Sequence, residues 1–411
     1  MKLISVFAIT MLMALPAWAT VPVPDATPAA VAYQHGKDFF FLFDFVFGLA
    51  IAALFLATGW AARLRDVAAR LSGGRWFWTV SLTVMIYSLL SALIGLPVAW
   101  CETFILPHHY GISTETAAHW VKDQATSLAV GGVLTLAVAW IPYLLLRRLP
   151  RTWWLWATAA LLPLVVLFVA VGPIFITPLF NHFGAMEDKR LESVLRAEAL
   201  RVGLGDAPIY VMDQSTTSKA PGAYVTGLFG TREIVLFDTL VKSFDEKQIK
   251  FVLGHEMKHY LLDDVWKIVG IVGALLLGGF FTVDFLGRFV LRRWGGRFGV
   301  GGLQDAASIP LLIAAFSIAN FVLTPVLNLQ IQSIEHEADR FGLELTQDND
   351  AAASAFVKLQ TGALGVPDPG WVQRIWRTDH PTLRDRIEFA NNYHPWKDGG
   401  KLVYGAYMKP E

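Results

Sequence analysis

The sequence is poor in cysteine, in charge and in nucleotide-binding motifs. Its one cysteine, Cys101, cannot close an internal disulfide, so a fold held together by disulfides is excluded. Charged residues make up only 17%, and 34 Lys and Arg balance 34 Asp and Glu, so no net field attracts nucleic acid and we expect no nucleic-acid partner. The stretch GGRFGVGG lacks the strand that precedes a phosphate-binding loop, so we expect no bound nucleotide.

Hydrophobic residues, in contrast, are abundant. They make up 54% of the 411 residues, and the mean hydropathy of +0.46 is typical of a protein that crosses a lipid bilayer several times. A helix needs about 20 apolar residues to span the hydrocarbon core. Runs of this length occur at residues 39–61, 77–100, 128–146, 153–180, 265–289 and 309–329. The predicted fold class is therefore a mainly α, polytopic membrane protein.

The first 19 residues have the pattern of a secretory signal peptide. Lys2 precedes an apolar run, and Ala17 and Ala19 form the small-residue motif before a cleavage point. We expect cleavage after Ala19, and the alternative is an uncleaved N-terminal anchor. Both place the next segment, residues 20–37, outside the cytoplasm.

Arginine in short loops predicts the orientation in the membrane. Three loops that would lie on one side of a six-span protein are rich in arginine, whereas the short loop at 101–127 has only one lysine, Lys122. Such an excess is typical of cytoplasmic loops. We therefore expect a multi-pass protein of the bacterial inner membrane whose long segments after the fourth and sixth spans face the periplasm. The arginines are Arg63, Arg65, Arg70, Arg75, Arg147, Arg148, Arg151, Arg288, Arg292, Arg293 and Arg297.

These patterns divide the chain into six parts. They are the signal segment 1–19, a periplasmic segment 20–37, a four-span domain 38–180, an α+β insert 181–264, a two-span hairpin 265–331 and a C-terminal segment 332–411. Within the insert we expect an amphipathic helix that ends at Gly203 or Gly205 and a β-hairpin that bends at Gly227 and Gly230. Ser243 and Glu246 have the spacing of a capping box at the start of a further helix.

That further helix contains the sequence HEMKH. His255 and His259 are four residues apart, so they share one face of a helix and can bind one zinc ion. Glu256 stands beside the metal, where it can act as general base for an attacking water. The alternative is a pair of surface histidines without a metal.

A catalytic zinc needs a third protein ligand, and the sequence IEHEAD after the last span offers one. Glu335 and Asp339 are four residues apart, so Glu335 can bind the metal while Asp339 holds a ligand histidine. His336 is a competing ligand on another face of the same helix. The prediction is one zinc ion per chain, held by His255, His259 and Glu335.

The stretches GHEMKHY, EHEAD, DHPTLRDRI, ITPLFNHF and IVLFDTL together resemble the type 1 CAAX prenyl protease family of membrane zinc metalloproteases. The resemblance implies a helical transmembrane barrel around a chamber, with a small α+β zinc-peptidase domain built from the HExxH helix and the β-hairpin. It also implies His380 as a catalytic group near the substrate carbonyl and Arg386 as a support for the carboxylates. One departure is Lys258, which stands where the family usually has glycine.

The expected reaction is hydrolysis of peptide bonds in membrane or exported polypeptides, in the service of envelope quality control. Ala223, Tyr224 and Val225 lie in a predicted edge strand that could hold an extended polypeptide by main-chain pairing. The periplasmic orientation argues against prenylated substrates. Two alternatives remain, a transporter whose polar residues Asp44 and Asp284 line an ion path, and a non-catalytic scaffold or chaperone on the same fold. The sequence predicts no oligomeric state.

Overall fold

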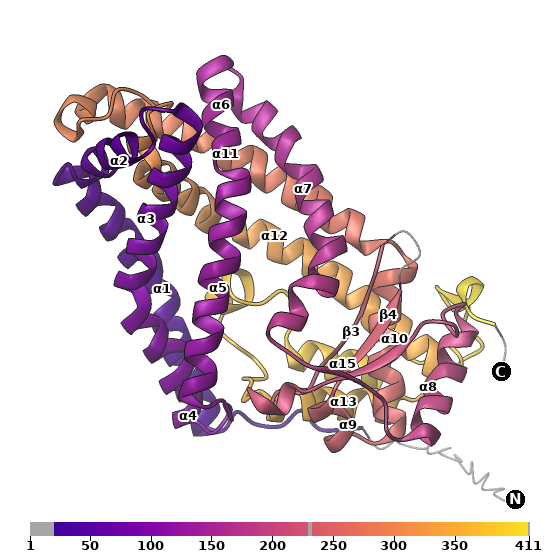
Figure 1. Ribbon diagram of the computed structural model, residues 1–411. Coiled ribbons are helices and arrows are strands. Elements are labelled where there is room, and N and C mark those ends of the chain that lie inside the picture. The colour runs from indigo at the N-terminus through magenta and orange to yellow at the C-terminus, as the bar shows by residue number, and fades with distance from the viewer. Residues whose placement is uncertain (1–19, 229–231, 410–411) are drawn as a thin grey trace, which may run out of the picture.

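The computed structural model describes residues 20–228 and 232–409, so the predicted signal segment and Gly230 lie outside the described residues. It confirms a mainly helical protein with six helices long and apolar enough to cross a membrane. They run over Pro28–Ala57, Trp76–His109, Ala117–Arg148, Trp153–Leu179, Asp264–Phe298 and Ala306–Thr346. The small sheet and its helices gather at one end of these long helices (Figure 1).

The membrane part is an open barrel of helices. Each helix contacts the next in the order α12, α1, α2, α3, α5, α6, α7, α11 and back to α12 (Figure 1). A π-helical segment, Trp100–Ile105, continues α3 into α4. The bounds are α1 Pro28–Ala57, α2 Trp60–Leu71, α3 Trp76–Ala99, α4 Leu106–His109, α5 Ala117–Val138, α6 Trp140–Arg148, α7 Trp153–Phe175, α11 Asp264–Phe298 and α12 Ile309–Thr346.

Several of these helices extend beyond the predicted spans, among them α1 and α12. α1 begins at Pro28, inside the segment predicted to precede the membrane, because Thr27 caps its N-terminus and proline suits the first turn. α12 continues past the predicted end of the sixth span without a break to Thr346. Glu335 therefore sits on the same rigid helix that crosses the membrane, and its position is fixed by the packing of that helix.

The α+β part is built around a four-stranded sheet in the order β1-β2-β4-β3. β2 and β4 are parallel, and β3 pairs antiparallel with β4 at the edge, which confirms the predicted hairpin. The predicted amphipathic helix ends two residues before Gly203. The bounds are β1 Phe183–Ala185, α8 Lys189–Arg201, β2 Ile209–Met212, β3 Ala223–Thr226, β4 Glu233–Phe237, α9 Asp238–Ser243, α10 Glu246–Leu261, α13 Asn349–Gly362, α14 Trp371–Trp376 and α15 Leu383–Asn392.

The helix that carries the histidines, α10, starts with a different cap from the predicted one. Asp245 accepts from the backbone N–H of Gln248, and the Gln248 side chain accepts from the backbone N–H of Asp245. The predicted pair of Ser243 and Glu246 is wrong because Ser243 is still the last residue of α9, where its hydroxyl donates to the Thr239 carbonyl. The motif is the same, shifted by two residues.

α10 packs closely against α12, and two glycines permit this contact. A Cβ atom on Gly254 would lie 3.2 Å from the Cα of Gly342, and one on Gly342 would lie 3.1 Å from the backbone N of His255. A side chain at either position would push the helices apart. This contact places the residue after Gly254, which is His255, directly against the helix that carries Glu335 and Asp339.

Candidate metal centre

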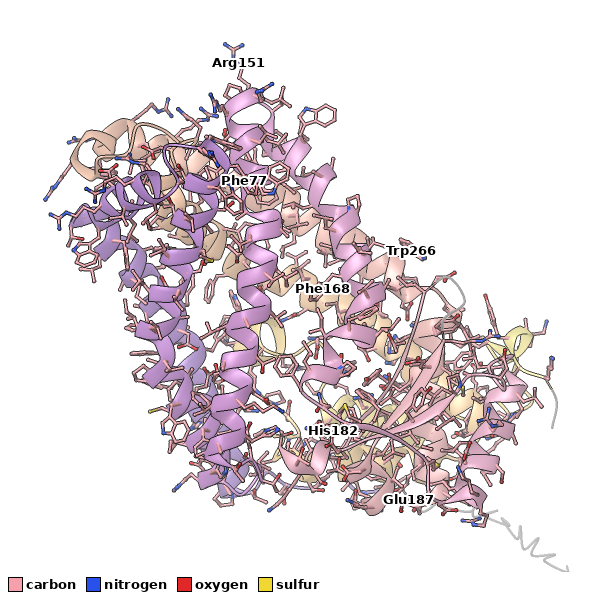
Figure 2. The ribbon with its side chains drawn as sticks, viewed as in Figure 1. Phe77, Arg151, Phe168, His182, Glu187 and Trp266 are labelled. Carbon is pink, nitrogen blue, oxygen red and sulfur yellow. The ribbon has the colours of Figure 1, made fainter. Side chains whose placement is uncertain are left out.

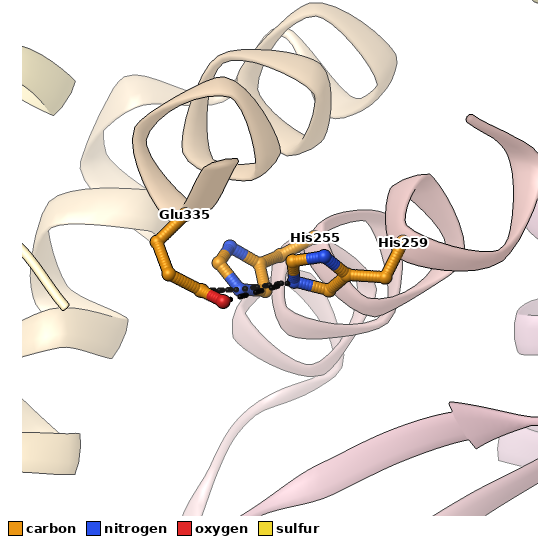
Figure 3. A group of neighbouring side chains, drawn as sticks. All are labelled: His255, His259 and Glu335. Carbon is orange, nitrogen blue, oxygen red and sulfur yellow. Dashed lines mark hydrogen bonds and ion pairs between the residues drawn. The ribbon is translucent and has the colours of Figure 1, made fainter. Parts of the chain in front are cut away.

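His255 and His259 of α10 face Glu335 of α12 (Figure 3). The Nε2 atom of His255 lies 3.1 Å from Glu335 Oε2, the Nε2 atom of His259 lies 3.6 Å from Glu335 Oε1, and the two Nε2 atoms are 3.4 Å apart. A tetrahedral zinc with bonds of about 2.0 to 2.1 Å requires ligand atoms about 3.3 Å apart. The three residues therefore fit one zinc ion, with a fourth position left for water or substrate.

His255 is held by a carboxylate and a guanidinium, called here the His255 support (Asp339 and Arg386). Asp339 Oδ1 lies 2.9 Å from His255 Nδ1, and Arg386 of α15 donates from Nε and Nη2 to the same carboxylate at 2.9 and 2.6 Å. Since a carboxylate can only accept, Nδ1 carries the proton and the lone pair of Nε2 is directed at the metal position. The Arg386 guanidinium also lies over the Phe356 ring, 4.2 Å from its centroid.

His259 has a support of its own, which the sequence did not predict. It consists of Asp264 and Lys258 and is called here the His259 support. Asp264 Oδ2 lies 2.9 Å from His259 Nδ1, and Lys258 Nζ donates to the same oxygen at 2.7 Å. Asp264 reaches back because Asp263 takes a left-handed conformation, with φ of +52°, which turns the chain sharply between α10 and α11. Each histidine thus presents Nε2 to the metal position and donates from Nδ1 to a buried carboxylate.

Glu256 and His380 complete the arrangement. Glu256 lies next to both histidines on α10, and burial raises the pKa of its carboxyl, although the histidines oppose this. His380 comes from the loop before α15, where Nε2 lies 3.2 Å from Glu335 Oε2 and Nδ1 lies 2.7 Å from Asp379 Oδ1. The structure therefore brings together His255, Glu256, His259, Glu335 and His380, all of which the sequence singled out.

The carboxylates around the two histidines stabilise the protonated, positively charged forms of their rings. Burial lowers the pKa of His255, but hydrogen bonds to Asp339 and Glu335 outweigh it and leave this pKa raised. Burial likewise opposes the rise at His259, where hydrogen bonds to Asp264 and Glu335 bring the pKa to about 9. A divalent cation would replace these protons, since a metal needs neutral imidazoles.

The predicted substrate strand borders this site. Val225 and Thr226 of β3 line a cavity of about 630 Å³ together with His259 and with apolar residues of α7 and α11. Gly222 and Phe237 are joined by a main-chain hydrogen bond. Because bonded pairs alternate along an antiparallel ladder, Ala223 and Val225 direct their N–H and C=O groups to the free edge, and Tyr224 pairs with β4.

Other candidates do not join the site. His336 lies 3.4 Å from Arg340 and packs on Phe389, so it is not one of the three grouped ligands. Within residues 20–228 and 232–409, one further group has metal-like spacing, namely Glu115, His119 and Asp123. Here Nδ1 of His119 lies 3.1 Å from Glu115, which precedes α5, and 3.6 Å from Asp123, one turn further along α5, so the histidine already pairs with both carboxylates.

Together the fold and the site define a multi-pass membrane metallopeptidase. Two family models match the chain: the CAAX prenyl protease N-terminal family, described as five membrane helices, over residues 23–182, and peptidase family M48 over residues 185–394. The uncharacterized metalloprotease YhfN of Bacillus subtilis is 32% identical over 370 residues, which cover 89% of this chain and 86% of that protein. The chain therefore belongs to peptidase family M48.

More distant relatives agree with this assignment. CAAX prenyl protease 1 of Saccharomyces cerevisiae is 27% identical over 315 residues, covering 73% of this chain and 69% of that protein. The crystal structure of S. mikatae Ste24p has the same fold, with a TM-score of 0.75 and 23% identity over 88% of this chain and 87% of that one. The resemblance drawn from the sequence motifs is thus confirmed at the level of the family and the fold.

Proposed function

We propose that this peptidase is a zinc-dependent endopeptidase of the bacterial inner membrane that cleaves membrane or exported polypeptides. The observation that carries the proposal is the spacing of the Nε2 atoms of His255 and His259 and the carboxylate of Glu335, all within 4.8 Å of one another, beside Glu256. One zinc ion per chain, when bound there, supplies a Lewis acid that polarises the scissile carbonyl and acidifies the attacking water.

The remaining steps belong to side chains of this protein. Glu256 accepts a proton from the attacking water and later passes it to the leaving amine, a role that its place on α10 beside His255 and His259 supports. His380 has a pKa of about 9, which burial opposes and Asp379 and Glu335 support. Its Nε2 atom lies 3.2 Å from Glu335 Oε2, beside the metal position, where a protonated imidazole can donate a hydrogen bond to the carbonyl oxygen as negative charge develops there. Asp339 and Arg386 keep His255 in place.

The substrate is an extended polypeptide that pairs with the free edge of β3. The outward main-chain groups of Ala223 and Val225 recognise a backbone rather than a particular sequence. The adjoining cavity accepts an apolar side chain, because its walls are mainly valine, leucine, isoleucine and tryptophan. These features suit varied, misfolded segments of membrane or exported proteins, which is why envelope quality control is the proposed role.

The active site faces the periplasm in this proposal. Arg151 lies at one end of the molecule and Glu187 at the opposite end, on the side of the sheet (Figure 2). The arginine-rich loops share the end of Arg151, which the positive-inside rule assigns to the cytoplasm. The division into a four-span domain (38–180), a catalytic insert (181–264), a two-span hairpin (265–331) and a C-terminal catalytic segment (332–411) fits this arrangement.

The alternative of a transporter depended on Asp44 and Asp284 as lining residues of an ion path, and the contacts of Asp284 argue against this role. Asp284 accepts hydrogen bonds from Trp153 at 2.6 Å and from Arg288 at 2.8 Å, so it holds α11 to α7 rather than standing free in an ion path. The scaffold alternative requires loss of a ligand or of Glu256, and all four residues are present.

The test compares the purified parent with Glu256→Gln, and with Glu246→Gln as a control on the first turn of the same helix, where Glu246 pairs with Arg190 away from the site. We expect about one zinc per chain in all three proteins. Hydrolysis of casein or a peptide should fall at least about 100-fold in Glu256→Gln only. Equal hydrolysis by the parent and Glu256→Gln would eliminate the proposed base.

A further inference from the structure

Lys258 is a buried cation in the HExxH motif that none of the proposed catalytic steps uses. Its side chain is 1% exposed, as is that of Asp264. A buried ammonium is costly unless charge and hydrogen bonds compensate it. Lys258 Nζ donates to Asp264 Oδ2 at 2.7 Å and to the backbone carbonyl of Ile334 at 2.8 Å.

These two acceptors lie next to two different metal ligands. Asp264 Oδ2 also accepts from Nδ1 of His259 at 2.9 Å. Ile334 directly precedes Glu335 on α12. One ammonium group therefore joins three elements, since Lys258 belongs to α10, Asp264 begins α11 and Ile334 belongs to α12. Through these bonds it reaches both His259 and the backbone that carries Glu335.

The relative position of His255 and Glu335 is fixed in a different way. His255 and Glu335 are related through Asp339, which is on the same helix as Glu335 and one turn further along. Nothing comparable on α12 contacts His259 through its Nδ1 atom, because that atom faces Asp264 of α11. The packing of α10 on α12 sets the approach of the two helices, but the orientation of the His259 ring toward Glu335 depends on where Asp264 of α11 lies relative to α12, and Lys258 links Asp264 to α12 directly.

We propose that Lys258 is a positioning residue that fixes His259 relative to Glu335 and so slows the loss of the metal ion. It touches neither the substrate nor the metal, and it acts through Asp264 and the Ile334 carbonyl. The inference rests on the zinc site of the proposed function. Substitutions of groups that hold metal ligands from behind change metal affinity by about 10- to 100-fold.

The chain offers a matched control. Lys267 Nζ contacts the other oxygen of the same carboxylate, Asp264 Oδ1, also at 2.7 Å, but its side chain is 53% exposed. An ammonium exposed to this degree is solvated, so its contact with Asp264 contributes little. Lys258→Met and Lys267→Met each remove one of the two ammonium groups that contact Asp264. In both variants methionine keeps the unbranched apolar part of the side chain.

The experiment measures release of zinc from the full-length protein in detergent to an excess of a coloured chelator. We expect release from Lys258→Met to be about 10- to 100-fold faster than from the parent, and release from Lys267→Met to stay within about 2-fold. The absorption spectrum of the cobalt-substituted proteins, which reports ligand geometry, should change in Lys258→Met and not in Lys267→Met.

Parental zinc release together with a parental cobalt spectrum in folded Lys258→Met would overturn the proposal, even if that variant melted at a lower temperature. Should Lys258→Met not fold, Lys258→Gln is measured in the same way, since it keeps a donor of shorter reach without the charge. Failure of the proposed function has a different signature, namely undiminished hydrolysis by Glu256→Gln, and metal release is measured independently of hydrolysis.

Discussion

The candidate metal centre has a closed side and an open side, and they differ in burial, in charge pairing and in access to solvent. On the closed side, where α10, α12 and α15 meet, Asp339 is 0% exposed, and the side chains of its partners His255 and Arg386 are 6% and 12% exposed. On the open side, His380 is 45% exposed and β3 presents a free edge. A metal ion requires fixed ligands, whereas a polypeptide substrate requires room to enter. Substitutions on the closed side should therefore release metal or unfold the protein, and substitutions on the open side should slow turnover.

The closed side contains a second contrast, between the two supports. The His255 support ends in Arg386, whose guanidinium stays charged at all relevant pH values. The His259 support ends in Lys258, and burial lowers the pKa of this lysine, against the effect of Asp264. A lysine that loses its carboxylate partner can shed its proton and become neutral, which an arginine cannot do. The two supports should thus respond differently to loss of their carboxylates.

Removal of the metal should have the largest effect, since both sides of the centre depend on the same ion. Treatment with a chelator is expected to abolish peptide hydrolysis, and added zinc should restore it, because the three ligands converge on one position. The measurement is hydrolysis against bound zinc during titration. Full hydrolysis by protein shown to be free of metal would refute the distinction between the two sides.

Asp339→Ala and Asp264→Ala test the contrast between the supports. Loss of Asp339 leaves Arg386 buried and unpaired, which should lower the free energy of unfolding by about 3 to 5 kcal/mol. Loss of Asp264 should cost less, because Lys258 can become neutral. Denaturant titration of both variants in detergent provides the comparison.

The pH dependence of Asp264→Ala supplies the control. Without Asp264 the folded-state pKa of Lys258 falls further below its unfolded value of about 10.4. The unfolded chain then binds more protons than the folded chain between these two values, so stability should rise with pH in that window. Asp339→Ala should lack this rise relative to the parent. Equal costs and parallel pH profiles for the two variants would show that the supports are equivalent.

His380→Gln tests the open side. The variant loses a cationic donor to the developing negative charge, so kcat should fall by about 100-fold while bound zinc is unchanged. Surface His394, which pairs with Asp398, is the matched control, and His394→Gln should retain parental kcat. If His380→Gln instead lost its zinc, His380 would belong functionally to the closed side.

The parts of the centre that follow from sequence are those set by the repeat of a single helix. His255 and His259 share a face because they are four apart, and the same spacing relates Glu335 to Asp339. Asp264 was missed because its return to His259 depends on the left-handed turn at Asp263, a conformation that non-glycine residues rarely adopt.

The close packing of α10 on α12 could not be predicted from the sequence either. The approach of α10 to α12 depends on Gly254 meeting Gly342, which are 88 residues apart in the numbering and share no local pattern. The burial of Lys258 follows from that approach and not from its neighbours in sequence, which would place a lysine on a solvated surface. Membrane spans were predictable in number because length and hydropathy are local, but their ends were set by caps and by continuation into the catalytic part.

The smallest predicted effect concerns the edge of β3. Val225→Pro removes an N–H that points away from β4 while leaving the ladder intact, since proline is tolerated on the free side of an edge strand. Loss of one hydrogen bond to the substrate, worth about 1 kcal/mol, should lower kcat/KM for an extended peptide about 5-fold. Val225→Ile, which keeps the N–H, should behave like the parent, and zinc content should not change in either variant. Parental kcat/KM for Val225→Pro would mean that the substrate backbone pairs elsewhere, and the open side would then be defined by His380 and the apolar cavity.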